Sequence, residues 1–512
     1  MKTKINQLKM SVVLTYLGVA FNILLSITYT PIMLKLLGQN EYGLYNTVSA
    51  TISLLSLLNL GFGSSYIRYY SQYKIRNDQE GINRLNGMFL TIFSVIGAVA
   101  LICGLILTNH LGLIFDNGLT EAEYGTARIL MFLMTINLAL SFPMSVFSNI
   151  INAHEKYVVL KGISLIKTVL TPIATLPLLF AGLKSIALVL VTISFNIIAD
   201  ILFIVFVLAK LKCRFSFKGF DKKLFYSLFG FTFFIAINLI IDQINWNVDK
   251  LILTRFKGTA EVAVYSVGYT IYTYYQMFSV SISSVFTPRI HKLVNETNDD
   301  NNKQKFVLTE IFVKVGRIQF LLLALIASGI VFFGEVFITK FWAGAEYKNS
   351  YIVAVLLVVS ASIALIQNLG IEIQRAQNRH QFRSFVYLGM AIINLICSIF
   401  LCQKYGAIGS TIGTAISLIL ANGLIMNIYY QKKCNINVIE FWKNILRMLL
   451  GMLPAFIVGF LIMYFVEITN LLYFGLWVII YIAVYFVSVW FLSSNRYEKN
   501  LLVTAFRKFK KN

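Results

Sequence analysis

The sequence predicts an all-α integral membrane protein with about fourteen transmembrane helices, arranged as two six-helix lobes followed by two C-terminal helices. Three observations lead to this fold class. Hydrophobic residues make up 58% of the 512 residues and charged residues only 13%, about half the charged share of a typical soluble protein. Apolar runs of about 20 residues, enough for a helix to cross a bilayer, recur along the whole chain. Lys and Arg residues gather in every second connection between those runs.

The apolar runs fall into three groups along the chain. The first six lie near residues 11–34, 44–67, 86–108, 127–153, 157–181 and 186–209. The second six lie near 225–247, 262–288, 306–334, 349–374, 383–402 and 407–430, and a final pair lies near 444–466 and 470–493. The first run follows three lysines, as in a secretory signal, but it is longer than a signal core of about 7–15 residues. We therefore expect it to be the first transmembrane helix.

The placement of the basic residues predicts the topology. If the N-terminus is cytoplasmic, the cytoplasmic connections hold 32 of the 44 Lys and Arg residues and the outer connections hold eight. The positive-inside rule then predicts that both termini are cytoplasmic. The net charge of +22 follows this topology and forms no basic patch interleaved with aromatic residues, so we expect no nucleic-acid partner. The basic tail at 496–511 is interpreted as an anchor to anionic membrane lipids.

The sequence argues against a metal- or cofactor-binding protein and against an enzyme. Five Cys and four His residues lie singly, without the spacing of a metal site, and we expect neither a bound metal nor a bound cofactor. The connections between apolar runs are too short to bury a core of their own. A catalytic domain is therefore excluded, and the chain is predicted not to be an enzyme.

Two pairs of similar segments indicate an internal repeat. GQNEYGLY at 38–45 and GTAEVAVY at 258–265 share Gly, Glu and Tyr at an offset of 220 residues. AHEK at 153–156 and AQNR at 376–379 pair at nearly the same offset. Because each repeat holds an even number of spans, the lobes should be related by an axis along the membrane normal, as in transporters. We predict an N-lobe at 1–215, a C-lobe at 216–432 and a C-terminal part at 433–512.

Three motifs resemble those of the bacterial polysaccharide flippases, the Wzx-type exporters within the multidrug/oligosaccharidyl-lipid/polysaccharide exporter superfamily. The motifs are LGQNEYGLY at 37–45, NLGFGSSYIR at 59–68 and VDKLIL at 248–253. The resemblance covers most of the first twelve spans. Relatives often carry an acidic residue where this chain has Asn59, so we assign that position no ion-coupling role.

The resemblance implies a function. It implies translocation of undecaprenyl-pyrophosphate-linked oligosaccharide repeat units from the inner to the outer leaflet of the bacterial cytoplasmic membrane, by alternating access. The product would be O-antigen, capsule or exopolysaccharide, with the polysaccharide polymerase and the chain-length regulator as candidate partners. Coupling to H+ or Na+ stays open.

Several alternatives remain beside this interpretation. A cation-coupled multidrug antiporter and a peptidoglycan-precursor flippase can share the same fold. A membrane glycosyltransferase or polymerase typically has a sizeable outer loop with paired carboxylates or arginines, which this sequence lacks. A scaffold for other assembly enzymes would need no cavity, so solvent access to membrane-embedded charges would distinguish it from a transporter.

Cationic residues within or beside the spans are candidates for binding the pyrophosphate. Lys167 and Arg317 lie about ten residues into their spans, near the membrane midplane at 1.5 Å per residue. Arg68 and Arg375 end spans on the cytoplasmic side, where Arg can bind phosphate oxygens with two N–H groups. Lys250 follows the seventh span. Anchoring at the membrane surface is the alternative role for each of these side chains.

Acidic residues in the spans are candidates for ion coupling. The seventh span carries a polar stripe at helical spacing, which includes Asp242 and Asp249 and should not face lipid. Asp242 is the first candidate, because a buried carboxylate can have a raised pKa. Asp200 in the sixth span and Glu372 in the tenth are further candidates. Static pairing with a nearby Lys or Arg is the alternative role of each.

Overall fold

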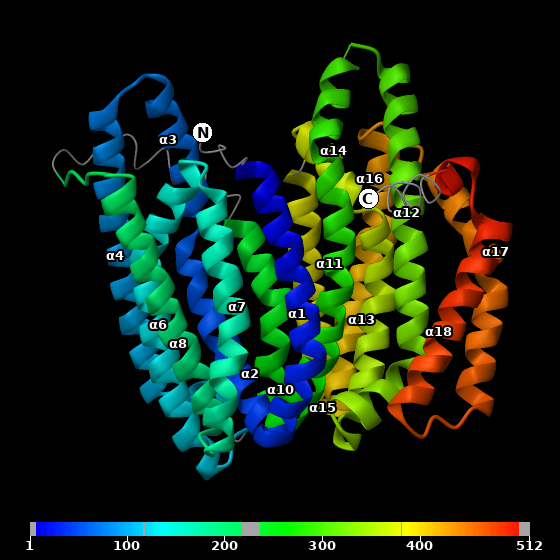
Figure 1. Ribbon diagram of the computed structural model, residues 1–512, viewed down its shortest axis with the longest axis horizontal. Helices are drawn as coiled ribbons and strands as arrows, with labels where there is room; N and C mark the ends of the chain where they lie inside the picture. The colour runs from blue at the N-terminus through cyan, green and yellow to red at the C-terminus, as the bar shows by residue number, and fades with distance from the viewer. Residues whose placement is uncertain (1–6, 116–117, 218–235, 298, 380, 501–512) are drawn as a thin grey trace, which may run out of the picture. The chain divides into compact units, whose positions relative to one another are not determined.

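The computed structural model describes residues 7–115, 118–217, 236–297, 299–379 and 381–500, which are helical almost throughout (Figure 1). Ten of the described helical segments are long and apolar enough to cross a membrane. The longest, at 381–433, contains Gly406 at φ 57° and ψ −136° and therefore holds two of the predicted spans. The remaining predicted spans fall on α11 (Thr259–Glu296), on α2 (Gln39–Leu55) and α3 (Phe62–Ile75), and on 225–247, of which 225–235 lies outside the described residues. The predicted all-α membrane fold is confirmed, and fourteen spans are consistent with it.

The chain forms two compact units. Unit 1 comprises Met1–Ala263 and Cys402–Gly406, and unit 2 comprises Val264–Leu401 and Ala407–Asn512. The predicted lobe limits at 215 and 432 stay a prediction.

Unit 1 is a helical bundle in which α4, α6 and α8 pack in sequence and α7 packs against α1 and α8. Apolar clusters fill it, one centred on Phe89 and Phe93 and another on Leu130 and Met131. Its helices are α1 (Gln7–Leu37), α2 (Gln39–Leu55), η1 (Ser56–Asn59), α3 (Phe62–Ile75), α4 (Gln79–Asn109), α5 (Leu111–Phe115), α6 (Glu121–Ala153), α7 (Tyr157–Phe180), α8 (Lys184–Val205), η2 (Phe206–Lys210), η3 (Ile244–Val248) and α10 (Asp249–Lys257).

Unit 2 is a second bundle, in which α12 packs against α13 and α17, and α18 packs against α12 and α17. The aromatic rings of Tyr481 and Tyr485 lie in its core. Its helices are α11 (Thr259–Glu296, whose first five residues belong to unit 1), α12 (Asn301–Val336), η4 (Phe337–Trp342), η5 (Ala345–Tyr347), α13 (Lys348–Ile366), α14 (Leu369–Ala376), α15 (Gln381–Leu418), η6 (Ile419–Ile425), α16 (Met426–Lys433), α17 (Val438–Phe465), α18 (Leu471–Ser488) and η7 (Val489–Ser493).

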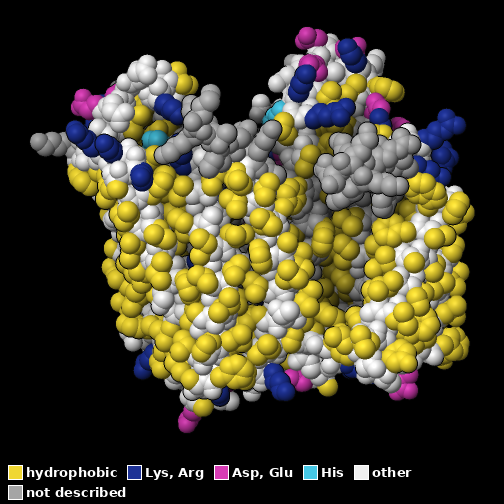
Figure 2. Space-filling model, in the orientation of Figure 1, with side chains coloured by type: hydrophobic (Ala, Val, Ile, Leu, Met, Phe, Trp, Pro, Cys, Tyr) yellow, Lys and Arg dark blue, Asp and Glu magenta, His cyan; other side chains and the backbone are white. Residues whose placement is uncertain are grey.

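The distribution of side chains on the surface fits a membrane protein. Figure 2 shows hydrophobic side chains covering the middle of the helices, while Lys, Arg, Asp and Glu gather towards the helix ends. The helices α11 and α12 are 38 and 36 residues long, which exceeds the roughly 20 residues that a bilayer requires. Both helices therefore extend beyond the hydrocarbon core.

The second span differs from the continuous helix expected at 44–67. Helix α2 begins directly after Gly38 and ends at Leu55, a 3₁₀ turn follows, and α3 starts at Phe62. Between them Leu60 and Gly61 have φ angles of 48° and 75°. A left-handed backbone cannot continue an α-helix, so the span is divided there.

The internal repeat is visible in the backbone. Gly38 and Gly258, which begin the two motif copies, both have positive φ, at 76° and 84°, with extended ψ. Glu155 and Asn378 of the second pair are both left-handed, with φ 58° and 55°. Equivalent positions in the two repeats thus adopt the same local conformation, although most of their side chains differ.

Candidate functional site

A polar cluster centred on Lys167 lies inside unit 1. The Lys167 ammonium on α7 donates to Oδ1 of Asn196 on α8 at 2.9 Å, and Nδ2 of Asn196 donates to Oδ1 of Asn137 on α6 at 3.0 Å. Three neighbouring helices therefore contribute to one hydrogen-bonded chain. Asp200, one turn beyond Asn196 on α8, interacts electrostatically with Lys167. The cluster combines a cation, a carboxylate and two amides in the membrane-spanning part of the chain.

The depth of Lys167 follows from its place in the helix. Helix α7 begins at Tyr157, so at a rise of 1.5 Å per residue Lys167 lies about 15 Å along it, half the thickness of the hydrocarbon core. An ionised side chain at that depth is costly unless polar groups or water solvate it. The amide oxygen of Asn196 partly meets this need.

Arg317 has a different environment, in unit 2. It is only 6% exposed, and its guanidinium binds Glu498 through two hydrogen bonds, Nε to Oε1 at 2.6 Å and Nη2 to Oε2 at 3.0 Å. The carbonyl of Ser493 accepts a further bond at 3.0 Å. Glu498 also accepts from the backbone N–H of Asn495. This pair fastens the segment after η7 to α12, and a substrate-binding role of Arg317 stays a prediction.

Two other predicted residues pair with each other. Arg375 and Glu372, three residues apart on α14, form an ion pair at 2.7 Å, and the Arg375 side chain is largely exposed. Arg68 on α3 is exposed, with its guanidinium 6.0 Å from the centre of the Tyr69 ring. The substrate-binding roles of Arg68 and Arg375 stay predictions.

The polar stripe of the seventh span is described only from residue 236 onwards. Asp249 and Lys250 are adjacent and buried at the start of α10, whereas Asp242 is exposed on the helical segment that precedes η3. The structure therefore separates Asp242 from Asp249 by burial, although sequence spacing had placed them on one stripe. Their coupling roles stay predictions.

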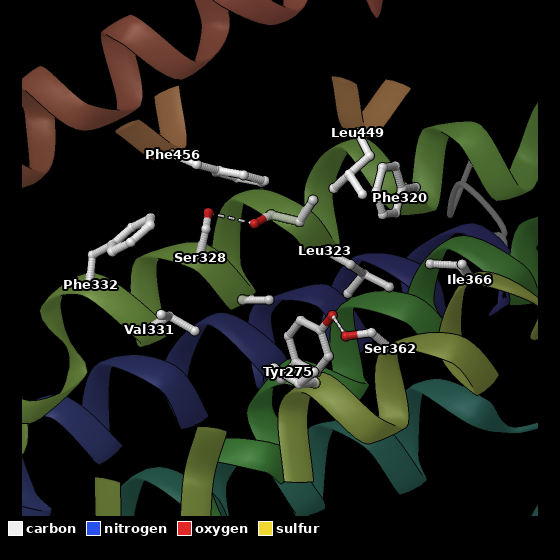
Figure 3. A pocket seen from close by; sticks show the side chains of 13 residues that line it. Tyr275, Phe320, Leu323, Ser328, Val331, Phe332, Ser362, Ile366, Leu449 and Phe456 are labelled. Carbon is white, nitrogen blue, oxygen red and sulfur yellow. Dashed lines mark hydrogen bonds between the residues drawn. The ribbon is translucent and has the colours of Figure 1, made fainter. Parts of the chain in front are cut away.

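An apolar cavity lies within unit 2 between α11, α12, α13 and α17 (Figure 3). Its volume is about 390 Å³, and the small side chains Ala324, Ala327 and Ser328 on α12 leave room for it. Two of its hydroxyl groups, those of Tyr275 and Ser362, bond to each other at 2.7 Å. The rest of the lining is almost entirely hydrocarbon, from Phe320, Leu323, Val331, Phe332, Val359, Ile366, Leu449 and Phe456. The cavity is suited to an aliphatic chain.

A titratable cluster lies at the end of α6, outside the membrane-spanning segments. His154 contacts the carbonyl of Ile150 at 2.9 Å and the hydroxyl of Tyr70 at 3.0 Å. Burial lowers the pKa of His154, and nearby Lys74 and Lys156 lower it further, against the opposing effect of the Ile150 carbonyl. His154 is therefore disposed to stay neutral in the folded protein.

Sequence reasoning missed Asn137, Glu498 and the apolar cavity. Asn137 lies in a predicted span, and a polar residue within an apolar span could have indicated a polar contact inside the bundle. Glu498 is 181 residues from Arg317, and no local pattern connects them. The cavity depends on the packing of four helices. Among the described residues, no group of three or more His, Cys, Asp or Glu side chains could hold a metal ion.

Comparisons with known proteins agree with this structure. Residues 8–294, more than half of the chain, match the family described as polysaccharide biosynthesis protein. The chain is 21% identical over 430 residues to a provisionally named O-antigen transporter of Shigella flexneri, covering 82% of this chain and 96% of that protein. It is 23% identical over 505 residues to the uncharacterized membrane protein EpsK of Bacillus subtilis strain 168, covering 96% of each.

The fold is similar to two solved structures. One is the lipid II flippase MurJ in an inward closed conformation, with a TM-score of 0.72 at 16% identity over 93% of this chain and 97% of that chain. The other is an inward-facing multidrug resistance transporter of the MATE family, with a TM-score of 0.65 at 11% identity over 81% of this chain and 96% of that chain. At these identities the likeness concerns the fold alone. The family match over more than half of its length shows that the chain belongs to the polysaccharide biosynthesis protein family.

Proposed function

We propose that this multi-pass membrane transporter flips undecaprenyl-pyrophosphate-linked oligosaccharide repeat units from the inner to the outer leaflet of the bacterial cytoplasmic membrane. It would do so by alternating access, without enzymatic chemistry, for O-antigen, capsule or exopolysaccharide synthesis. Both termini would be cytoplasmic. The polysaccharide polymerase and the chain-length regulator are its proposed partners.

The observation that carries the proposal is the hydrogen-bonded Lys167 halfway along α7. A flippase must offer the pyrophosphate a cationic group on its way across the hydrocarbon core, because the anion alone would face a large desolvation penalty. An ammonium that donates to a neutral amide oxygen can instead donate to a phosphate oxygen without first breaking a hydrogen bond to a carboxylate. We therefore propose Lys167 as the first pyrophosphate contact, ahead of Arg317, Arg68, Arg375 and Lys250.

The apolar cavity of unit 2 supports a lipid-linked substrate. Aliphatic surface gains about 25 cal/mol for each Å² removed from water, but it gains little on leaving lipid. The cavity is therefore better suited to guiding a polyprenyl tail than to binding it tightly. A substrate without a lipid tail would have no aliphatic chain to contact this apolar surface.

Asp200 is the carboxylate that we propose for coupling to H+ or Na+. It interacts with Lys167, so a change in its charge would change the affinity of the cluster for an anion. Protonation of Asp200 would strengthen the hold on a phosphate, and loss of the proton would weaken it. Asp242, Asp249 and Glu372 remain further candidates.

The test is complementation of a bacterium that lacks its repeat-unit flippase, scored by surface polymer at matched membrane expression. We expect wild type and Lys161→Ala to restore the polymer, because Lys161 is an exposed lysine on the same helix. Lys167→Ala and Asp200→Asn should restore far less. Full restoration by Lys167→Ala would remove Lys167 from the proposed site, and failure of wild type with several glycans would refute the flippase function.

The rival functions have their own readouts. A multidrug antiporter on this fold would lower cellular accumulation of a cationic dye in an efflux-deficient strain. A peptidoglycan-precursor flippase would support growth of a strain depleted of its lipid II flippase. The near balance of cations and carboxylates among the candidate residues favours an anionic lipid over a cationic drug.

A further inference from the structure

The fourth span is interrupted at Pro143, inside α6. Proline has no N–H, so the carbonyl of Ala139 loses the partner that a continuous helix would provide. Gly97 on α4 faces that carbonyl, because a Cβ at Gly97 would lie 2.5 Å from the oxygen of Ala139 and 3.3 Å from Cδ of Pro143. The absence of a side chain at Gly97 thus lets α4 pack directly against the weakened turn of α6.

The tenth span is interrupted without a proline, at the junction of α13 and α14. The amide of Gly370, which a continuous helix would direct to Ile366, donates to the carbonyl of Gln367 at 2.8 Å. Gly316 on α12 faces this turn, because a Cβ there would lie 3.1 Å from the oxygen of Ile366 and against the Phe441 ring. A tighter turn therefore replaces one turn of α-helix, and a glycine of the preceding span packs against it.

The two interruptions occupy equivalent positions of the internal repeat. Its two pairs of similar segments have offsets of 220 and 223 residues, and Gly97 and Gly316 differ by 219. Pro143 and Ile366 differ by 223. One repeat makes the interruption with a proline and the other with a tight turn, so different residues weaken the same place. An interruption that was only tolerated would have no reason to recur there by two different means.

Side-chain hydroxyls bond to backbone carbonyls beside each interruption. In α6, Ser145 Oγ donates to the carbonyl of Phe142 at 2.6 Å. In unit 2, Ser279 Oγ of α11 donates to the carbonyl of Leu365 at 2.7 Å. Such hydroxyls satisfy carbonyls whose helical bonds a bend opens. A change of bend angle should therefore cost less at these turns than in a regular helix.

Beyond each interruption lies a short segment that ends in the same kind of turn. Residues 144–153 complete α6, and α14 comprises Leu369–Ala376. Glu155 and Asn378, which follow two residues later, are both left-handed. We call these two segments the inner segments, because the predicted topology places them at the cytoplasmic ends of their spans.

In unit 1 the inner segment packs against α3, which itself follows the interruption of the second span. Ile150 lies in one buried cluster with Tyr66 of α3, and the hydroxyl of Tyr70 on α3 contacts His154 at 3.0 Å. Two spans of unit 1 are thus interrupted, and the parts beyond their interruptions are packed on each other. These parts are suited to moving as a single body.

We propose that the interruptions of spans four and ten are a matched pair of hinges, about which the two inner segments swing during transport. This proposal rests on the proposed function, in which the cytoplasmic mouth must open and close. At 1.5 Å per residue, a ten-residue inner segment is about 15 Å long. A change of roughly 20° in bend angle, the size of a sharp helix kink, would move its end by about 5 Å.

The competing interpretation is a static kink, and the two interpretations differ in the number of distances they predict. Double electron–electron resonance on the full chain in lipid nanodiscs measures them, after replacement of the five native cysteines. One nitroxide pair, at Asn152 and Lys210, reports on unit 1, and a second pair, at Ala376 and Lys432, reports on unit 2. We expect each pair in the wild type to show two distances about 5 Å apart. A static kink gives one.

Replacement of Pro143 tests the hinge of span four. Pro143→Ala supplies the missing N–H and should straighten α6, so we expect a single distance in unit 1 and several-fold less surface polymer on complementation, without a lower unfolding temperature. Pro143→Gly keeps a weak turn without the ring and should retain both distances. Pro454→Ala is the matched control, because Pro454 interrupts α17, outside the repeat. It should behave like wild type in both assays.

The outcomes separate the hinges from the proposed function. One distance in either unit of the wild type, or two distances in Pro143→Ala as in the wild type, would overturn the hinges. Full complementation by a Pro143→Ala variant with one distance would also overturn the proposal, because transport would then not use the bend. Two distances in a wild type that fails to complement with several glycans would leave the hinges standing and remove the flippase function.

Discussion

Replacing Gly43 by alanine should destabilise unit 1, because no space exists for a methyl group. A Cβ at Gly43 would lie 1.8 Å from the carbonyl oxygen of Thr259 and 2.6 Å from its carbon, whereas ordinary contact begins near 3.4 Å. Helix α2 and the start of α11 would have to separate by roughly 1.5 Å, and the 2.7 Å bond between Thr47 and Thr254 would be strained with them.

The magnitude follows from three opposing contributions. Overpacking costs about 1–3 kcal/mol, and a rigid backbone neighbour places this site at the upper end of that range. Loss of the hydrogen bond between the two threonines adds about 1 kcal/mol to this cost, while the higher helix propensity of alanine offsets about 1 kcal/mol of it. The net cost is about 2–3 kcal/mol. The second motif copy carries Ala263 at the equivalent position, so the need for glycine arises from this contact and not from the motif.

The assay is thermal unfolding in detergent, followed by the loss of helical circular dichroism and by size-exclusion chromatography after heating. Gly162→Ala on α7 is the matched control, because a Cβ there meets no atom within 4 Å. We expect Gly43→Ala to unfold at a clearly lower temperature than wild type and Gly162→Ala to unfold at the same or a higher temperature. Equal unfolding temperatures for Gly43→Ala and wild type would refute the packing argument.

Three further predictions concern unit 1 and unit 2 separately. Glu498→Gln should lower the free energy of unfolding by about 3–5 kcal/mol, because it leaves Arg317 charged and buried without its carboxylate partner. The double replacement Arg317→Met/Glu498→Leu should unfold at a higher temperature than Glu498→Gln, because it leaves no buried charge. The reverse order of unfolding temperatures would contradict the argument from the buried pair. Neutral His154 contributes stability in full above pH 6.5, and this contribution is lost as the pH falls from 6.5 through its lowered folded-state pKa. His154→Gln should therefore flatten the fall in unfolding temperature between about pH 7 and pH 5, and an unchanged pH profile would count against it. Ala327→Leu should fill part of the 390 Å³ cavity and reduce flippase complementation without lowering the unfolding temperature; unchanged complementation would argue against a tail-binding role.

The helices and the repeat could be predicted from the sequence because both depend on short-range patterns. Runs of apolar residues set helix lengths, and the two glycines that begin the motif copies keep the same positive φ. The division of the second span could not be predicted with the same certainty. Leucine rarely adopts a left-handed backbone, so Leu60 gives no local warning of the break, and only Gly61 does.

The candidate site shows where prediction from spacing fails. Lys167 and Arg317 looked equivalent in the sequence, since each lies about ten residues into an apolar run. The structure gives them different partners: an amide for Lys167, and for Arg317 a carboxylate that takes two of its N–H groups. A phosphate that approached Arg317 would have to displace Glu498 and leave a buried carboxylate unpaired, whereas a phosphate at Lys167 would replace a neutral oxygen. The partner of a membrane-embedded cation, more than its depth, therefore decides whether it can bind and release an anionic substrate.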